Sequence, residues 1–116
     1  MLNTIPKEML YWNHDHTQYA ILISPRYGAG WSTWNDPKLA YDKNVVKLWL
    51  KTKDNPYTGK VFVKNELSLL GYKDVYLGGY SNIEVIWIHE GDIWRITEYY
   101  GAESIEFLES EEYYYA

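Results

Sequence analysis

The chain has 116 residues, a formal net charge of −5 and no cysteine. This length predicts one domain, residues 1–116, with an independent core, and the lack of cysteine excludes disulfides, thiolate metal sites and cysteine nucleophiles. The negative charge argues against nonspecific nucleic-acid binding, which depends on lysine and arginine neutralising phosphates, but it is compatible with one locally basic pocket.

The N-terminal segment, residues 1–18, has no basic region followed by an apolar run, and the apolar stretches of the chain are far shorter than a membrane span. We therefore expect a soluble cytoplasmic protein without a membrane partner. His14 and His16 invite a metal-site interpretation, with His89 as a third ligand. Because no acidic or histidine ligand follows at a recognisable spacing, the sequence predicts no metal and no cofactor.

The first predicted elements are a strand and a helix. Residues 19–24, YAILIS, form a short apolar run that is typical of a buried strand. Asn35 or Asp36 can cap a helix with proline at its first position, and apolar residues at helical spacing extend it over 37–52. Asp42 could restart this helix after an irregular first turn.

The middle of the chain is less clear. Trp49 lies on the apolar stripe of the predicted helix, so we expect it in the core. Val61 and Val63 favour a strand over residues 61–71, whereas the leucines that follow favour a helical turn ended by Gly71. We favour a short helix here.

The C-terminal half predicts strands. Runs of β-branched and aromatic residues at 83–88, 93–100 and 104–108 are separated by short glycine-containing connections. They predict a three-stranded antiparallel meander, followed by an acidic, tyrosine-rich tail over 109–116. The predicted fold class is α+β, a mainly antiparallel sheet with one or two helices packed on one face.

The segment SPRYGAGWSTWND, residues 24–36 and here called the Gly-Trp loop, is the strongest candidate site. A loop that runs from a strand to a helix N-terminus presents free N–H groups that bind anions. Its glycines allow close approach, its hydroxyls and arginine can bind an anionic group, and its tryptophans can stack on a flat ring. The alternative is that both tryptophans fill the core. The predicted ligand-binding residues are Arg26, Tyr27, Gly28, Gly30, Trp31, Ser32, Thr33, Trp34 and Asn35.

A second candidate group is the late segment with Glu98, Tyr99, Glu103 and Ser104, which a strand–turn–strand path can gather beside the loop. Paired carboxylates could serve acid–base chemistry or bind a divalent cation. A solvated strand edge with protective charges is the alternative that we favour for their chemistry.

The segments YGAGWSTWN, LAYDKNVVKLWL, YLGGYSNIEVIWI and WRITEYYGAESIEF resemble a family of small phage- and prophage-encoded proteins over residues 19–108. That family has no settled activity and often carries Asp at the position of Tyr100. The resemblance implies an origin in the cytoplasm of an infected or lysogenic bacterial host, where small phage accessory proteins often counter defence systems.

Serine-nucleophile motifs such as GxSxG are absent, so we name no catalytic residue and lean away from an enzyme. The expected function is a phage-type accessory binding protein that sequesters a small anionic or nucleotide-like ligand through the Gly-Trp loop. One alternative is a protein-binding inhibitor of a host defence nuclease or effector, whose acidic surface imitates nucleic acid. A small enzyme or a virion-associated protein are further alternatives, and the sequence leaves open whether the chain forms homo-oligomers.

Overall fold

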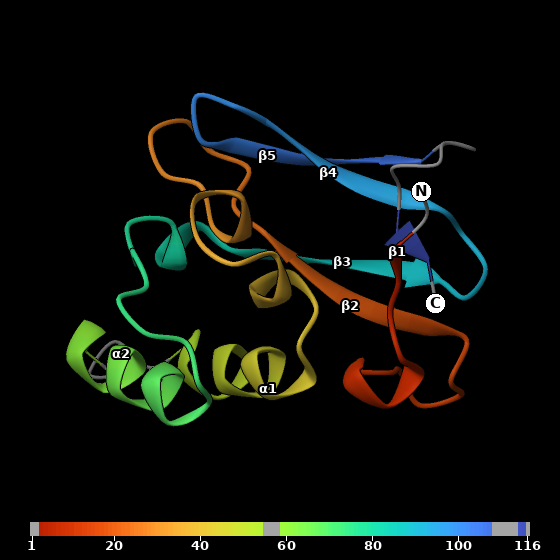
Figure 1. Ribbon diagram of the computed structural model, residues 1–116, viewed down its shortest axis with the longest axis horizontal. Helices are drawn as coiled ribbons and strands as arrows, with labels where there is room; N and C mark the ends of the chain where they lie inside the picture. The colour runs from red at the N-terminus through yellow and green to blue at the C-terminus, as the bar shows by residue number, and fades with distance from the viewer. Residues whose placement is uncertain (1–2, 55–58, 108–113, 116) are drawn as a thin grey trace.

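Two small sheets and two helices form the architecture (Figure 1). The computed structural model describes residues 3–54, 59–107 and 114–115. Short 3-10 turns lie at Lys7–Met9, Ser32–Trp34, Pro37–Ala40 and Tyr80–Asn82. The helices and strands are β1 (Asn3–Thr4), β2 (Gln18–Ile23), α1 (Lys43–Thr52), α2 (Lys60–Leu69), β3 (Glu84–His89), β4 (Trp94–Tyr99), β5 (Ala102–Phe107) and β6 (Tyr114–Tyr115).

The strands pair in two groups. β2 and β3 form an antiparallel two-stranded sheet, in which Gln18 faces His89. The other sheet has the order β1-β6-β4-β5, with an antiparallel β4–β5 hairpin and a parallel β1–β6 pair. Figure 1 shows β2 and β3 between the β4–β5 hairpin and the layer that contains α1 and α2.

The strand β2 separates two hydrophobic cores. Ala20 and Leu22 belong to a core shared with α1 and α2, which we call the helix-side core. Tyr19, Ile21 and Ile23 alternate with them and belong to the strand-side core, shared with β3, β4 and β5. Burial on both faces explains why the sequence of β2 is a continuous apolar run rather than an alternation. The predicted strand over 19–24 is confirmed.

The helices follow the local signals of the sequence. The Asp36 side chain accepts a hydrogen bond from the Lys38 amide and opens the 3-10 turn, and the Asp42 side chain accepts one from the Asn44 amide and opens α1. The helix predicted over 37–52 is therefore present with the restart at Asp42. Trp49 is buried in the helix-side core, as expected. α2 is the short helix favoured for 61–71, and Gly71 follows it with a φ of 101°.

The α+β fold class is confirmed, but the predicted meander is only partly right. β3, β4 and β5 are strands, and β4 pairs with β5, whereas β3 pairs with β2. The connection 90–93 carries the chain from one sheet to the other (Figure 1). Because β2 is buried on both faces, its backbone N–H and C=O groups need a strand partner, and β3 supplies it. The tail over 109–116 lies outside the described residues, apart from β6.

No helix in the described part of the chain is both long enough and apolar enough to span a membrane.

The stability of the strand-side core should depend on pH through Tyr19. Its side chain is fully buried, and the Trp94 indole Nε1 donates a 2.8 Å hydrogen bond to its hydroxyl. Burial raises the pKa of Tyr19 to about 12 from an ordinary value of about 10. A raised pKa means that the folded state favours the neutral phenol, so the stabilisation is complete below pH 10 and is lost as the pH rises towards 12.

We therefore expect the free energy of unfolding to fall by about 2–3 kcal/mol between pH 10 and 12 through Tyr19, at ~1.4 kcal/mol per pKa unit. Urea unfolding at several pH values measures this loss. The Tyr19→Phe variant should lose less stability over the same pH range than the wild type. Burial also raises the pKa values of Tyr72 and Tyr80, so part of the alkaline loss should remain. Equal losses in both proteins would contradict the assignment to Tyr19.

Candidate functional site

The buried side chain of Glu103 holds the Gly-Trp loop against β5. Oε1 of Glu103 accepts a hydrogen bond from the Ser24 amide at 2.9 Å. Oε2 accepts three, from the Trp31 amide at 2.8 Å, the Thr33 amide at 3.0 Å and the Thr33 hydroxyl at 2.5 Å. The Glu103 amide also donates to the Ser24 carbonyl at 2.8 Å. Two distant segments of the chain are thereby joined around one carboxylate, which we call the Glu103 clamp.

The Glu103 clamp changes the interpretation of the loop. The sequence predicted that loop amides would receive an anionic group of a ligand. In the structure, the amides of Trp31 and Thr33 bind a carboxylate of the chain itself, and Glu103 is only 2% exposed. These amides therefore do not form an open anion site. The loop has the chemistry that was predicted for it, but the anion is internal.

The predicted stacking of Trp31 on a ligand is wrong, because its ring lies in the helix-side core with no exposed surface. The indole Nε1 donates to the Leu39 carbonyl at 2.9 Å, and the ring meets Tyr80 edge to face at a centroid distance of 5.6 Å. The alternative stated for this residue, a core position, is the observed one. Truncation of Trp31 would therefore open a core cavity rather than remove a ligand contact.

The second half of the loop connects to residues 75–77. Trp34 is 42% exposed, and its ring lies against the Tyr76 ring at a centroid distance of 5.9 Å. The Asn35 side chain accepts from the Tyr76 amide at 2.8 Å and donates to the Tyr76 carbonyl at 3.0 Å. Asn35 thus acts as a structural bridge, and both Trp34 and Tyr76, which is 51% exposed, present large rings to solvent here.

The first half of the loop lies against the β4–β5 turn. The Gly28 amide donates to the Tyr100 carbonyl at 2.7 Å. A Cβ on Gly101 would lie 2.6 Å from the Ala29 nitrogen, so this position requires glycine. Gly28 has a φ of 97°, in the region that favours glycine. Gly101 thus serves the close contact between loop and turn, Gly28 serves the backbone conformation, and Gly30 is buried against the Thr33 and Trp34 side chains.

Exposed tyrosines gather where the loop meets this turn. Tyr27, Tyr99 and Tyr100 are 72%, 65% and 73% exposed. The rings of Tyr27 and Tyr99 meet edge to face at 6.1 Å, and those of Tyr99 and Tyr100 at 4.6 Å. Arg26 precedes Tyr27 and is also exposed. We call these four residues the tyrosine tip.

Only part of the late candidate group comes together. Glu98 and Glu103 face each other across the β4–β5 hairpin, but Glu98 is exposed and caps the Gly101 amide at 2.9 Å. Both oxygens of Glu103 are already engaged by the loop. The Ser104 hydroxyl instead pairs with Thr97 at 2.7 Å. This arrangement offers no free pair of carboxylates, and the described residues hold no group of three or more potential metal ligands.

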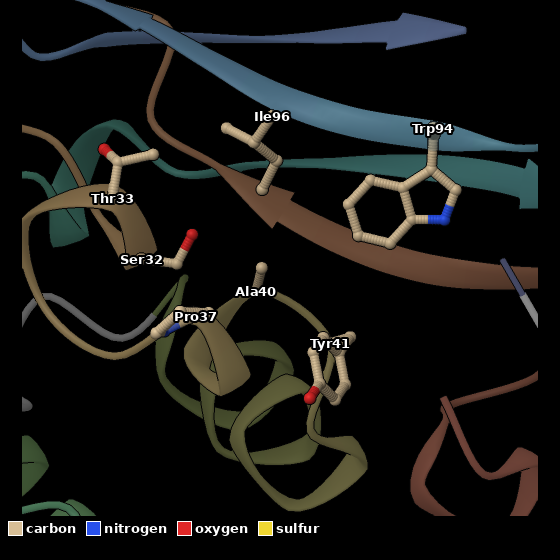
Figure 2. A pocket seen from close by; sticks show the side chains of 7 residues that line it. All are labelled: Ser32, Thr33, Pro37, Ala40, Tyr41, Trp94 and Ile96. Atoms are coloured by element: carbon tan, nitrogen blue, oxygen red, sulfur yellow. The ribbon is translucent and has the colours of Figure 1, made fainter. Parts of the chain in front are cut away.

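A cavity of about 120 Å³ lies under the loop, between the 3-10 turns and the inner face of β4 (Figure 2). Ser32 is 3% exposed, and Figure 2 shows its hydroxyl directed into this space. The residues that line the cavity are Ser32, Thr33, Pro37, Ala40, Tyr41, Trp94 and Ile96. Two predicted site residues, Ser32 and Thr33, therefore do border a pocket, although it is not the pocket that was expected.

Sequence reasoning missed the clamp role of Glu103 and the contribution of Tyr41, Trp94 and Ile96 to the cavity. One feature of the sequence indicates the burial of Glu103: it shares a strand face with Ile105, which packs against the strand-side core. A carboxylate in that position needs internal donors because burial without them is costly. The cavity residues come from segments more than fifty positions apart, so no local pattern indicates them.

The Glu103 clamp predicts a graded loss of stability. Glu103→Ala leaves four donors without their acceptor, and we expect the free energy of unfolding to fall by at least about 3 kcal/mol. Glu103→Gln keeps one carbonyl acceptor and should cost about 1–2 kcal/mol. The matched control is Glu98→Gln on the facing, exposed position, which should cost less than about 1 kcal/mol.

Urea unfolding of the three variants measures these costs. If Glu103→Ala and Glu98→Gln cost the same, the carboxylate does not hold the loop.

No family model, curated protein or solved structure matches the chain. Its function is therefore inferred from its own residues.

Proposed function

We propose that this chain is a small, non-catalytic binding protein that recognises a partner protein through the tyrosine tip. The observation that supports this most directly is a cluster of three exposed rings, in which Tyr99 contacts both Tyr27 and Tyr100. Tyrosine combines a large apolar surface with a polar hydroxyl, and it is enriched at protein interfaces and among their energetically dominant residues.

The contacts that hold the tyrosine tip in place support this proposal. The Gly28–Tyr100 hydrogen bond ties the two segments that carry the rings, and the Glu103 clamp fixes the loop from below. Tyr100 itself has a φ of 49°, a backbone conformation that residues other than glycine, asparagine and aspartate rarely adopt. A rigid, pre-arranged set of rings loses little conformational entropy when it binds.

Charge indicates the chemistry of the partner. Residues 74–116 contain ten Asp and Glu residues but only one Lys or Arg. Glu84 and Glu98, on β3 and β4, are both exposed. An acidic surface with protruding aromatic rings favours a basic partner and increases the rate of association with it. With the resemblance to phage-encoded proteins, this points to a nucleic-acid-binding host defence protein in the bacterial cytoplasm.

A paired substitution tests this function. We expect Tyr27→Ser/Tyr99→Ser to weaken binding of the partner at least about 30-fold, since dominant interface residues each contribute 2 kcal/mol or more. The matched control is Phe62→Ser, which removes an exposed ring from α2 in the helical layer (Figure 1).

The partner is first identified by affinity capture from bacterial lysate and mass spectrometry, and is then purified for titration calorimetry. Retention of full affinity by the tip variant, or equal losses in both variants, would contradict recognition through the tip.

A second candidate function is the binding of a small anionic or nucleotide-like ligand at a site other than the Gly-Trp loop. An open groove of about 470 Å³ lies between the N-terminal segment and α1, within the size range of ligand sites. It combines cationic and aromatic side chains, as sites for phosphorylated rings do. The residues that line it are Lys7, Glu8, Leu10, Tyr11, Trp12, His16, Lys43 and Lys47.

Substitution of Lys43 and Lys47 tests this candidate function, because both lysines line the groove and lie one helical turn apart on α1. Mass spectrometry of molecules released from the denatured protein should show an anionic compound with the wild type and a strongly reduced amount with Lys43→Ala/Lys47→Ala. The control is Lys60→Ala/Lys64→Ala on α2, with the same spacing outside the groove. Equal yields from both double variants would exclude the groove.

A further inference from the structure

The cavity under the Gly-Trp loop has the size of a small-molecule site. Its volume is about 120 Å³, and an apolar cavity of about 150 Å³ in another protein holds benzene. It lies between well-buried groups, since Trp94 and Ala40 are each 1% exposed. Thr33 and Pro37, which also line it, are exposed, so the cavity opens to solvent on that side. It is too small for a nucleotide but large enough for one ring.

The Ser32 hydroxyl points into this space (Figure 2). Ser32 is 3% exposed, and Figure 2 shows its hydroxyl facing the cavity. Among the residues that the structure describes, none forms a hydrogen bond with this hydroxyl, whereas the neighbouring Thr33 hydroxyl is held by Glu103. Among the described residues, no fully buried side-chain nitrogen or oxygen is without a hydrogen-bond partner, so the Ser32 hydroxyl oxygen keeps surface that can be reached from the cavity. The Ser32 hydroxyl is therefore suited to a molecule that enters the cavity.

The remaining walls define the chemistry of that molecule. Trp94 and Tyr41 contribute rings, and Ile96, Ala40 and Pro37 contribute aliphatic surface. The indole nitrogen of Trp94 donates to Tyr19 on the side away from the cavity, so its carbocyclic ring faces the space. No charged side chain is among the described residues of the lining. A charged ligand would lose its hydration here without gaining a counter-charge.

We propose that this cavity binds a small, neutral, ring-bearing molecule with one hydrogen-bonding group, which the Ser32 hydroxyl recognises. The ring occupies the apolar space beside Trp94, and its polar substituent pairs with Ser32. This site is separate from the tyrosine tip and from the lysine-lined groove, so it stands whether or not either proposed function does. Phenol is the simplest probe of this chemistry, because it fits the volume and is neutral at pH 7.

Titration of the full chain with phenol, followed by two-dimensional amide NMR, tests the proposal. We expect saturable shifts at Ser32, Thr33, Ala40 and Ile96, with a Kd on the order of 1 mM or below for a ligand of this size. Benzene should bind at least about fivefold more weakly because it cannot pair with the hydroxyl, as expected for one net hydrogen bond. Benzoate, with the same ring and a negative charge, should not bind.

Two variants locate the binding. Ser32→Ala should weaken phenol binding about fivefold to tenfold and leave benzene binding unchanged. Ala40→Met fills the cavity and should abolish binding of both. Absence of saturable shifts would mean that the cavity holds only water, and it would overturn the proposal. Equal affinity of Ser32→Ala and wild type for phenol, or benzoate binding as tight as phenol binding, would overturn it as well. If Ala40→Met does not fold, the Ser32→Ala comparison decides alone.

Discussion

The buried carboxylate of Glu103 holds the loop that contributes to both the tyrosine tip and the cavity. The Glu103 carboxylate accepts hydrogen bonds from three backbone amides and one hydroxyl, and no described residue forms an ion pair with it. Such an arrangement is costly to bury and is stable only when every acceptor position is served. The Gly-Trp loop provides these donors in the observed conformation. Hydrogen bonds to a carboxylate of the chain itself therefore hold the loop, together with its short 3-10 turn.

Both recognition features depend on this conformation. Ser32 lies between Trp31 and Thr33, the two residues whose amides Oε2 of Glu103 binds, so the clamp holds the backbone on both sides of it. On the other side, Ser24 leads into Arg26 and Tyr27, and the Gly28–Tyr100 bond brings Tyr27 to the turn of the same hairpin that carries Glu103. A single strand, β5, thereby fixes both a pocket and an exposed cluster of rings.

Local sequence signals predicted the elements well and their assembly less well. Asp36, Asp42 and Gly71 mark ends of helical segments because capping is a matter of a few neighbouring residues, and the structure follows these signals. The partner of β3 could not be predicted in this way. Whether it joins β4 or β2 depends on which strand needs its hydrogen bonds, and that is decided by the burial of β2 on both faces.

The difference between local signals and long-range assembly also explains which site residues could be predicted. The composition of the Gly-Trp loop correctly indicated amides directed at an anion, but composition does not say whether the anion is a ligand or a residue seventy positions away. Trp31 shows the converse case: its indole can stack on a ligand or fill a core, and only the position of Leu39 and Tyr80 decides between them. Once Glu103 and Trp31 are assigned to the interior, the exposed rings of Tyr27, Tyr99 and Tyr100 contact one another and belong to neither hydrophobic core of the described residues. Surface rings that fill no core and are nonetheless held in place by a buried clamp are what a binding surface requires, and this is why the tip rather than the loop centre carries the functional proposal.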